Sequence, residues 1–239
     1  MFGNRTLLIT LCCLILAVGN GFAQSLTLTG QQIVTKMADR YATARTYQDI
    51  GISRKVAADG STAVSEEPAV YFRTYFDRPN RFRFEWEDQL TSKSWGILWS
   101  DGDNVFVKWA NRQMEKQRSL EAGIAGASPF LLSAARDVPN LLMRDLGGFR
   151  LTQIQRVTRL RDAKVGDDLC FVVRGYHPYG FQVDLWIGKS DFLLRRKLEK
   201  NDDGTFDEEV RSYIQLNSII PARKFQFDSI QKGELVAKL

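Results

Sequence analysis

A histidine and a cysteine are the first residues to consider for catalysis, because both side chains can act as nucleophiles, bases or metal ligands. The single histidine, His177, stands in GYHPYG, and a position beside proline in a turn is typical of an ordinary loop. Cys170 alternates with Leu169 and Phe171, so we expect it on a strand, with no neighbour that would activate its thiol. The chain contains neither a Gly-x-Ser-x-Gly elbow nor a Cys-His pair within one motif. The sequence therefore predicts no catalytic residues.

Carboxylates could instead hold a metal ion or act as acid and base. Residues 201–209 contain five Asp and Glu side chains, but their spacing differs from that of a calcium-binding loop, which favours a solvated hairpin. Glu85 and Glu87 share one face of a predicted strand without any accompanying pocket signal. No glycine-rich phosphate loop is present. We therefore predict no metal site and no cofactor, and an envelope hydrolase stays open only as a second alternative.

A binding surface is suggested by residues 71–88, YFRTYFDRPNRFRFEWED, where aromatic and basic residues alternate. Such side chains could stack on bases and hold phosphates if they shared one surface. Residues two apart on a strand share a face, so Phe82, Phe84 and Trp86 point one way and the charged residues at 81, 83, 85 and 87 point the other. We therefore expect no nucleic-acid partner, aromatic side chains that face inward and a charged face that is solvated.

The N-terminus has the layout of a secretory signal peptide. Arg5 precedes an apolar run of about 12 residues, 7–18, which is shorter than the roughly 20 residues that span a bilayer as a helix. Gly21 and Ala23 place small residues before a cut after Ala23. We predict a signal peptide at 1–23, a single domain at 24–239 and a periplasmic location, with a retained anchor as the alternative.

The remaining chain has Cys170 as its only cysteine, so no disulfide within the chain can form and stability must come from the core. The net charge of +5 falls by one when Arg5 is removed, and charges of both signs are interspersed. A modest positive charge is compatible with anionic lipid headgroups or acidic partners, and most simply with solubility.

The pattern of apolar residues predicts the elements that position these side chains. Apolar residues at 33, 37, 41 and 44 predict an amphipathic helix, with Thr29 as its N-cap. From residue 46 to residue 109 the alternation predicts strands, with turns at 78–80 and at Asp101-Gly102. Alternation returns after Phe149 and continues as a meander to about residue 217.

Between the two strand regions the sequence predicts a helical insert. Ser128-Pro129 is expected to open one short helix, and Asp137 with Pro139 a second, which would end at Gly147-Gly148. About ten antiparallel strands are too many for a flat open sheet, so the sheet should curl beneath its helices. The fold class is therefore α+β, with a curled antiparallel sheet covered by an N-terminal helix and a short helical insert.

The inward aromatic face, extended by the strands around residues 95–109, can be either a filled core or the lining of a cavity, and both interpretations stay open. A concave sheet with a leucine-rich helical lid is one way to build an apolar pocket, where leucine and methionine adapt to an acyl chain. The candidate cavity residues are Met37, Tyr41, Phe82, Phe84, Trp86, Trp95, Trp99, Trp109, Leu131, Leu132, Leu142 and Met143.

Three segments carry a resemblance to a known family. RPNRFRFEW, WSDGDNVFVKWANRQMEK and SPFLLSAARDVPNLL occur in the order found in LolA-like periplasmic lipoprotein carriers, and the similarity extends from about residue 30 to residue 227. The sequence most resembles the outer-membrane lipoprotein-sorting-like proteins. The resemblance implies a half-open β-barrel closed by helices over a hydrophobic cavity that holds acyl chains, without catalytic residues. A long polar linker at 51–70 departs from this pattern, and no strand arginine can be matched to the one used by the carrier.

From these observations we expect a non-enzymatic carrier or sensor that binds lipid or a lipidated protein and contacts the membrane transiently. Glycines at 123, 126, 147 and 148 are candidate hinges of the lid. Substitution of Leu142 by Glu is expected to reduce ligand binding with little loss of folding. The alternative is an envelope protein-interaction module of the same fold, with a filled core and envelope proteins as partners.

Overall fold

The computed structural model describes residues 27–57, 69–88, 94–131 and 133–226, and among these the side chains of 128–131 are not described. The predicted signal peptide at 1–23, Leu132 and the side chain of Leu131 therefore lie outside the described part of the chain. The signal peptide and the single domain stay predictions.

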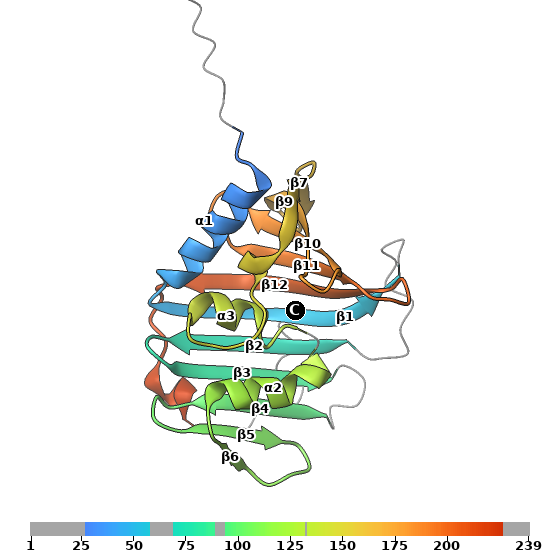
Figure 1. Cartoon of the computed structure of the whole chain (residues 1–239). Coiled ribbons are helices and arrows are strands. Elements are labelled where there is room, and N and C mark those ends of the chain that lie inside the picture. The colour runs from blue at the N-terminus through green and yellow to red at the C-terminus, as the bar shows by residue number, and fades with distance from the viewer. Residues whose placement is uncertain (1–26, 58–68, 89–93, 132, 227–239) are drawn as a thin grey trace, which may run out of the picture.

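In the described part of the chain, twelve antiparallel strands form one sheet, which is the main layer of the molecule (Figure 1). The order across the sheet is β6-β5-β4-β3-β2-β1-β12-β11-β10-β9-β7, and β8 pairs with β9. The strands are β1 (Thr46–Val56), β2 (Val70–Asp77), β3 (Arg81–Asp88), β4 (Trp95–Ser100), β5 (Val105–Trp109), β6 (Glu115–Gln117), β7 (Gln155–Arg159), β8 (Ala163–Val165), β9 (Asp168–Tyr176), β10 (Gln182–Gly188), β11 (Leu194–Lys200) and β12 (Phe206–Leu216).

The α+β class is confirmed, whereas the curled, half-open barrel is not. The strands at the two ends of the order, β6 and β7, do not pair with each other, and the sheet is neither closed nor strongly curled (Figure 1). The sheet consists of two meanders joined where β1 pairs with β12, in a register that runs from Tyr47 opposite Leu216 to Val56 opposite Phe206. The shape is therefore an open platform with its helices on one side.

The N-terminal helix, α1 (Gly30–Ala42), begins where the sequence predicts it. Thr29 Oγ1 accepts a hydrogen bond from the backbone N–H of Gln32 at 3.2 Å, and Gln32 Oε1 accepts one from the backbone N–H of Thr29 at 2.9 Å. This reciprocal cap satisfies two N–H groups that a helix start leaves unpaired. The buried side of α1 carries Ile33, Met37 and Tyr41, so the predicted apolar face is confirmed.

The helical insert consists of α2 (Leu120–Leu131) and α3 (Asp137–Leu142), and two short 3₁₀ helices follow, η1 (Leu151–Gln153) and η2 (Ala222–Phe225). The first helix begins at Leu120 instead of at Ser128-Pro129, because Ser119 Oγ accepts a hydrogen bond from the N–H of Ala122 and caps the earlier start. The second helix begins at Asp137 as predicted but ends at Leu142, before the glycine pair.

The three α-helices cover one side of the sheet, called here the helix face (Figure 1). Phe82, Phe84 and Trp86 belong to the buried cluster on this face, as predicted. In the pairing of β3 with β4, however, Trp95 lies opposite Glu87 and Trp99 opposite Arg83, so Trp95 and Trp99 point to the other side, called here the outer face. The alternation within β4 was predicted correctly, but its phase relative to β3 depends on the connecting loop and cannot be inferred from alternation.

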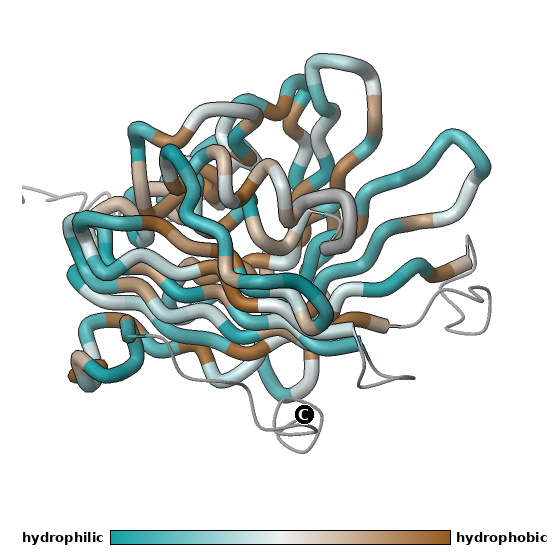
Figure 2. The backbone as a smooth tube through the Cα atoms, turned by 90° about the horizontal axis from the view of Figure 1, so that it is seen from below, coloured by the Kyte–Doolittle hydropathy of each residue, from teal (hydrophilic) through white to brown (hydrophobic). Residues whose placement is uncertain are grey.

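The outer face is buried where the sequence predicted solvation. Arg83, Glu85 and Glu87 are only 3%, 3% and 1% exposed. Arg83 donates to the backbone carbonyl of Gln226 at 2.7 Å, and Arg73 Nε donates to Glu85 at 2.7 Å. Figure 2 shows apolar and polar residues alternating along the strands, yet here the charged residues between the aromatic ones pair with one another and with the backbone after η2. Alternating charge on a strand therefore did not indicate a solvated face.

Candidate ligand-binding groove

An open groove lies on the helix face, between α2 and the edge strands β4, β5 and β6, and has a volume of about 520 Å³. Pockets that bind small molecules typically have volumes of roughly 300–1,000 Å³, so the groove is large enough for such a ligand. It is lined by Ser94, Trp95, Val107, Trp109, Ala110, Asn111, Arg112, Glu115, Gln117, Gly123 and Gly126.

Two glycines of α2 shape the roof of this groove. A Cβ atom added at Gly123 would lie 2.5 Å from Leu98 Cδ1, so α2 approaches the sheet closely at this position. A Cβ atom added at Gly126 would meet no atom within 4 Å. Because Gly126 has no side chain, the space beside it stays open and forms part of the groove. Inside a helix, glycine lowers stability by about 1 kcal/mol relative to alanine.

The floor of the groove is aromatic. Trp86 and Trp109 lie opposite Gly96 from its two neighbouring strands, and their rings meet edge to face with centroids 4.9 Å apart. Gly96 makes this possible, because a Cβ atom there would lie 2.0 Å from Cζ2 of Trp86. Trp109 is only half-buried. The indole of Trp109 can thus contact an apolar ligand in the groove, whereas Val107, only 4% exposed, offers it little surface.

The rim of the groove is polar. Asn111, Arg112, Glu115 and Gln117 follow the aromatic strand β5 and surround one end of the groove. This combination of an apolar floor and a polar rim can bind an amphiphilic molecule. These rim residues were not predicted from the sequence; their signal is the polar stretch ANRQMEKQR directly after an aromatic strand.

The predicted cavity residues are distributed differently. Most of them lie side by side in one buried cluster, where none is more than 8% exposed: Met37, Tyr41, Phe82, Phe84, Trp86, Leu142 and Met143. The centre of the helix face is therefore filled by side chains. Of the predicted residues whose side chains the structure describes, only Trp109 and Trp95 border the groove. Trp95 borders it from the first position of β4, while its side chain packs with Ile97 and Trp99 on the outer face. Trp99 packs on the outer face against Phe106, with ring centroids 5.1 Å apart.

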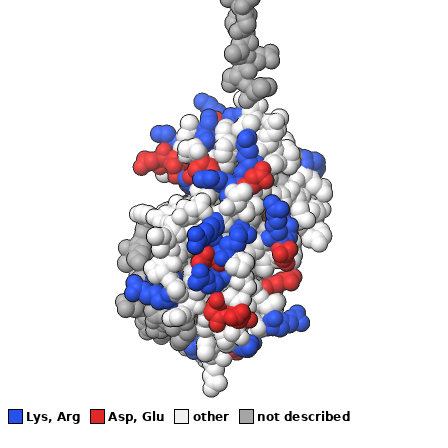
Figure 3. Space-filling model, turned by 90° about the vertical axis from the view of Figure 1, so that its left-hand side faces the viewer, with Lys and Arg blue, Asp and Glu red and all other residues white. Residues whose placement is uncertain are grey.

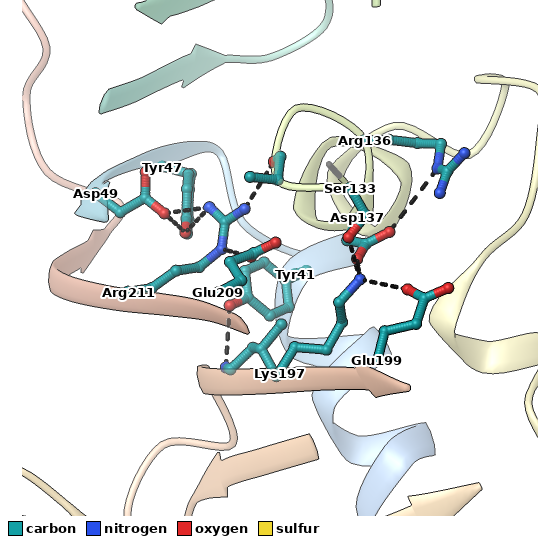
Figure 4. A network of polar contacts seen from close by, with 12 residues as sticks. Tyr41, Tyr47, Asp49, Ser133, Arg136, Asp137, Lys197, Glu199, Glu209 and Arg211 are labelled. Atoms are coloured by element: carbon teal, nitrogen blue, oxygen red, sulfur yellow. Dashed lines mark hydrogen bonds and ion pairs between the residues drawn. The ribbon is translucent and has the colours of Figure 1, made fainter. Parts of the chain in front are cut away.

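Beneath the helical insert lies a buried polar network, which Figure 4 shows from close by. Its first centre is Arg211 of β12, whose side chain is fully buried. The guanidinium pairs with Asp49 and Glu209, and its Nη2 donates to the backbone carbonyl of Ala134 at 2.8 Å. Tyr47 donates its hydroxyl hydrogen to Asp49. Arg211 thus links the two central strands to the segment between α2 and α3.

The second centre of this network is Lys197 of β11, which is 1% exposed (Figure 4). Its Nζ donates to Ser133 Oγ, to Asp137 Oδ2 at 2.5 Å and to Glu199 Oε2 at 3.0 Å. Asp137 is the first residue of α3. The lysine therefore fixes the start of α3 to the sheet.

The pKa values within the network follow from burial and charge. Burial alone would lower the pKa of Lys197, but the carboxylates of Asp137 and Glu199 raise it above its ordinary value. Burial likewise opposes the charged form of Arg211, and Glu209 with Asp49 outweighs it and raises the pKa. For Glu209 the burial is the larger effect and raises the pKa, although Arg211 acts against it. The two cations of the network therefore remain charged.

The network corrects two expectations from the sequence. The acidic stretch 201–209 was predicted to be a solvated hairpin, but Glu208 and Glu209 are only 3% and 2% exposed. They belong to β12 and not to the turn; Glu208 pairs with Arg54 and Arg196, and Glu209 pairs with Arg211. Arg211 and Lys197 themselves were missed; their signal was a basic residue at an inward-facing strand position, which requires a buried partner.

His177 and Cys170, the two residues considered for catalysis, lie in surroundings that do not activate them. The ring of His177 lies against Phe149 with centroids 3.8 Å apart, its Nδ1 accepts the backbone N–H of Tyr179, and burial lowers its pKa. Cys170 is buried, and burial raises the pKa of its thiol to about 11, which keeps it in the less reactive protonated form. Within residues 27–226 as far as they are described, no three His, Cys, Asp or Glu side chains cluster as metal ligands would.

None of the helices in the described segments combines the length and the apolar character that crossing a membrane requires. No family model matches the sequence, and no curated protein matches it either.

Solved structures with a similar arrangement do exist, at low sequence identity. An uncharacterized conserved protein from Thermus thermophilus is 10% identical, with a TM-score of 0.49 over 84% of this chain and 95% of that chain. MucB is 12% identical, with a TM-score of 0.46 over 84% of this chain and 63% of that chain, and has also been solved in complex with MucA(peri). A LolA superfamily protein from Nitrosomonas europaea is 13% identical, with a TM-score of 0.37 over 84% and 99%.

Proposed function

We propose that the protein is a non-enzymatic carrier or sensor of the cell envelope, and that it binds a lipid or the acyl chain of a lipidated protein in the groove beneath α2. The observation that carries the proposal is the open space at Gly126 above the half-buried ring of Trp109. Each methylene group that leaves water for this groove would stabilise the complex by about 0.8 kcal/mol. The envelope location and the transient membrane contact belong to the proposal.

The arrangement of the insert supports α2 as the part that adapts to the ligand. The segment from Ser133 to Asp137 is tied to the sheet by Arg211 and Lys197. Helix α2 instead contacts the sheet through Ile124 and Ala127 and through the close approach at Gly123. A ligand longer than the groove would therefore displace α2 while α3 stays in place.

A substitution that fills the groove tests the proposal. Gly126→Leu places a side chain in the open space, whereas the matched control Gly126→Ala makes the same backbone change and adds a single methyl group. Binding of a neutral fluorescent probe and of a long-chain acyl ligand should fall at least tenfold in Gly126→Leu and persist in Gly126→Ala, because only leucine competes for the groove volume. Equal binding in the two variants would refute the groove as the site.

The filled centre of the helix face favours a second function, an envelope protein-interaction module of the same fold. The buried cluster around Phe84 and Met37 leaves no room for a ligand without movement of the helices. If native mass spectrometry of the protein from an envelope fraction shows no lipid, and the probe binds neither variant nor the wild type, this second function takes the lead. A near-stoichiometric lipid that is absent from Gly126→Leu would exclude it as the sole role.

A further inference from the structure

A cleft of about 380 Å³ lies on the outer face, on the side of the sheet opposite the groove, and is called here the outer cleft. Its lining comes from the central strands β1, β2 and β12. Gln48 lies opposite Tyr75 of β2 and opposite Gln215 of β12, and residues that lie opposite one another share a face of the sheet. Because Tyr75 in turn lies opposite Arg83 of the outer face, all three side chains point to the outer cleft.

A bulge in β12 places a tyrosine ring beside this cleft. In the pairing with β1, two residues of β12, Tyr213 and Ile214, stand opposite the single residue Asp49. Tyr213 has a φ of 51°, a left-handed conformation that is uncommon for an aromatic residue, and a bulge of this kind re-aims a side chain. The tyrosine lines the outer cleft and is 71% exposed. In the described part of the chain its side chain has no aromatic, cationic or hydrogen-bonding partner, so the ring is available to a ligand.

Two glutamine amides of the outer cleft offer a hydrogen-bond donor and an acceptor. Gln48 Nε2 donates to Gln215 Oε1 at 2.6 Å and to Ser218 Oγ at 3.3 Å. Among the described residues, neither Gln48 Oε1 nor Gln215 Nε2 has a hydrogen-bond partner. A hydroxyl group donates one hydrogen bond and accepts others. The two amides can therefore bind a ligand that carries hydroxyl groups.

Neither charged side chain that lines the outer cleft is free. Arg73 is 6% exposed and pairs with Glu85 at 2.5 Å. Asp49 pairs with Arg211 beneath the helices, on the other side of the sheet. On the face of the molecule seen in Figure 3, basic and acidic side chains likewise lie next to one another. A charged ligand would have to break a buried ion pair to use either group, so the outer cleft favours an uncharged ligand.

We propose that the outer cleft binds a neutral saccharide. The C–H face of the sugar ring stacks on Tyr213, because the face of an aromatic ring is negative and attracts C–H hydrogens. The sugar hydroxyls bind to the free amide atoms of Gln48 and Gln215. A peptide that adds itself as a strand fits less well, since β1, β2 and β12 are paired on both sides and offer no free edge. This site lies apart from the groove and does not depend on the function proposed above.

Titration calorimetry with three neutral disaccharides, maltose, cellobiose and N,N′-diacetylchitobiose, tests the proposal. At least one of them should bind with a Kd of about 1 mM or lower. Tyr213→Ala should weaken this binding about tenfold, because it removes the stacking ring. The matched control Tyr179→Ala removes a tyrosine that is 83% exposed in the turn after β9, and it should bind as the wild type does. Both tyrosines are exposed, so both variants are expected to fold, which thermal melting checks.

Two more variants test the amides and the independence of the site. Gln215→Glu keeps an oxygen that accepts from Gln48 and replaces the free donor by an acceptor, so it should weaken saccharide binding about fivefold. Gly126→Leu fills the groove on the helix face and should leave saccharide binding unchanged. Failure of the groove as a lipid site would therefore not affect this proposal.

The outcomes decide between the saccharide and other occupants of the outer cleft. The proposal is overturned if the wild type binds none of the three disaccharides, or if Tyr179→Ala weakens binding as much as Tyr213→Ala does. Binding of glucose 6-phosphate without any neutral sugar would mean that Arg73, or Lys224 over the Tyr75 ring, holds an anion, and this overturns it as well. Binding of acetyl-tetraalanine amide without any sugar would identify a peptide site and would equally overturn it.

Discussion

The buried lysine beneath α3 allows a quantitative prediction. Lys197 and Asp137 are each 1% exposed at the side chain and form an ion pair of 2.5 Å, while Glu199 keeps 26% exposure. The substitution Lys197→Met removes the charge and preserves most of the side-chain volume. It leaves the buried carboxylate of Asp137 with only the more distant Arg136, whose Nε lies 3.9 Å away and whose side chain is 36% exposed, whereas Glu199 can still be hydrated.

Breaking a buried ion pair by removing one partner costs about 3–5 kcal/mol, which is a large fraction of the roughly 5–15 kcal/mol that stabilises a typical domain. Urea unfolding of the protein should therefore show a free energy of unfolding lower by about 3–5 kcal/mol in Lys197→Met. The double variant Lys197→Met/Asp137→Leu should regain most of this loss, because no uncompensated charge remains buried.

A half-exposed pair provides the control. Lys189 pairs with Asp162 with side-chain exposures of 35% and 22%, and Asp162 keeps a second partner in Arg159. Lys189→Met should therefore cost less than about 1 kcal/mol. The reasoning fails if Lys197→Met costs no more than this control, or if the double variant is as unstable as the single one.

Two further predictions concern the core and the network. Leu142 is fully buried in the main cluster, so Leu142→Glu is expected to unfold the protein, as circular dichroism would detect, and not to reduce ligand binding alone; a folded variant would show that Leu142 can reach solvent. Because burial raises the pKa of Glu209 in the folded state, that state binds more protons above about pH 4.3, and the free energy of unfolding should fall there as the pH rises. Glu209→Gln should remove this fall above about pH 4.3, and identical pH profiles of variant and wild type would contradict it.

The sequence predicted well the features that depend on neighbouring residues. The cap at Thr29, the face of α1 with Met37 and Tyr41, and the turn at Asp101-Gly102 follow from local hydrogen bonding and periodicity. Phe82, Phe84 and Trp86 were also placed on the correct side, since alternation within one strand is a local property.

Features that depend on pairing between distant residues were not predictable in this way. Trp99 lies on the outer face because of the register between β3 and β4, which alternation in a single strand does not determine. Arg211 meets Asp49 from a position far along the chain, and only the pairing of β1 with β12 brings the two together. The groove itself depends on a missing side chain at Gly126, which a search for aromatic residues could not reveal.

The order of strands in the sheet has a consequence for how the chain folds. From β1 to β6 and from β7 to β12, every strand pairs only with its sequence neighbours or the next strand but one, so these two meanders have low contact order and should form early. The two meanders join only when β1 pairs with β12, and this pairing closes a long loop of chain, which costs conformational entropy. At this seam Gly51 leaves no space for a Cβ atom, which would lie 2.5 Å from the carbonyl oxygen of Val210. Closure of the seam between β1 and β12 is therefore expected to limit the rate at which the platform beneath the groove is completed.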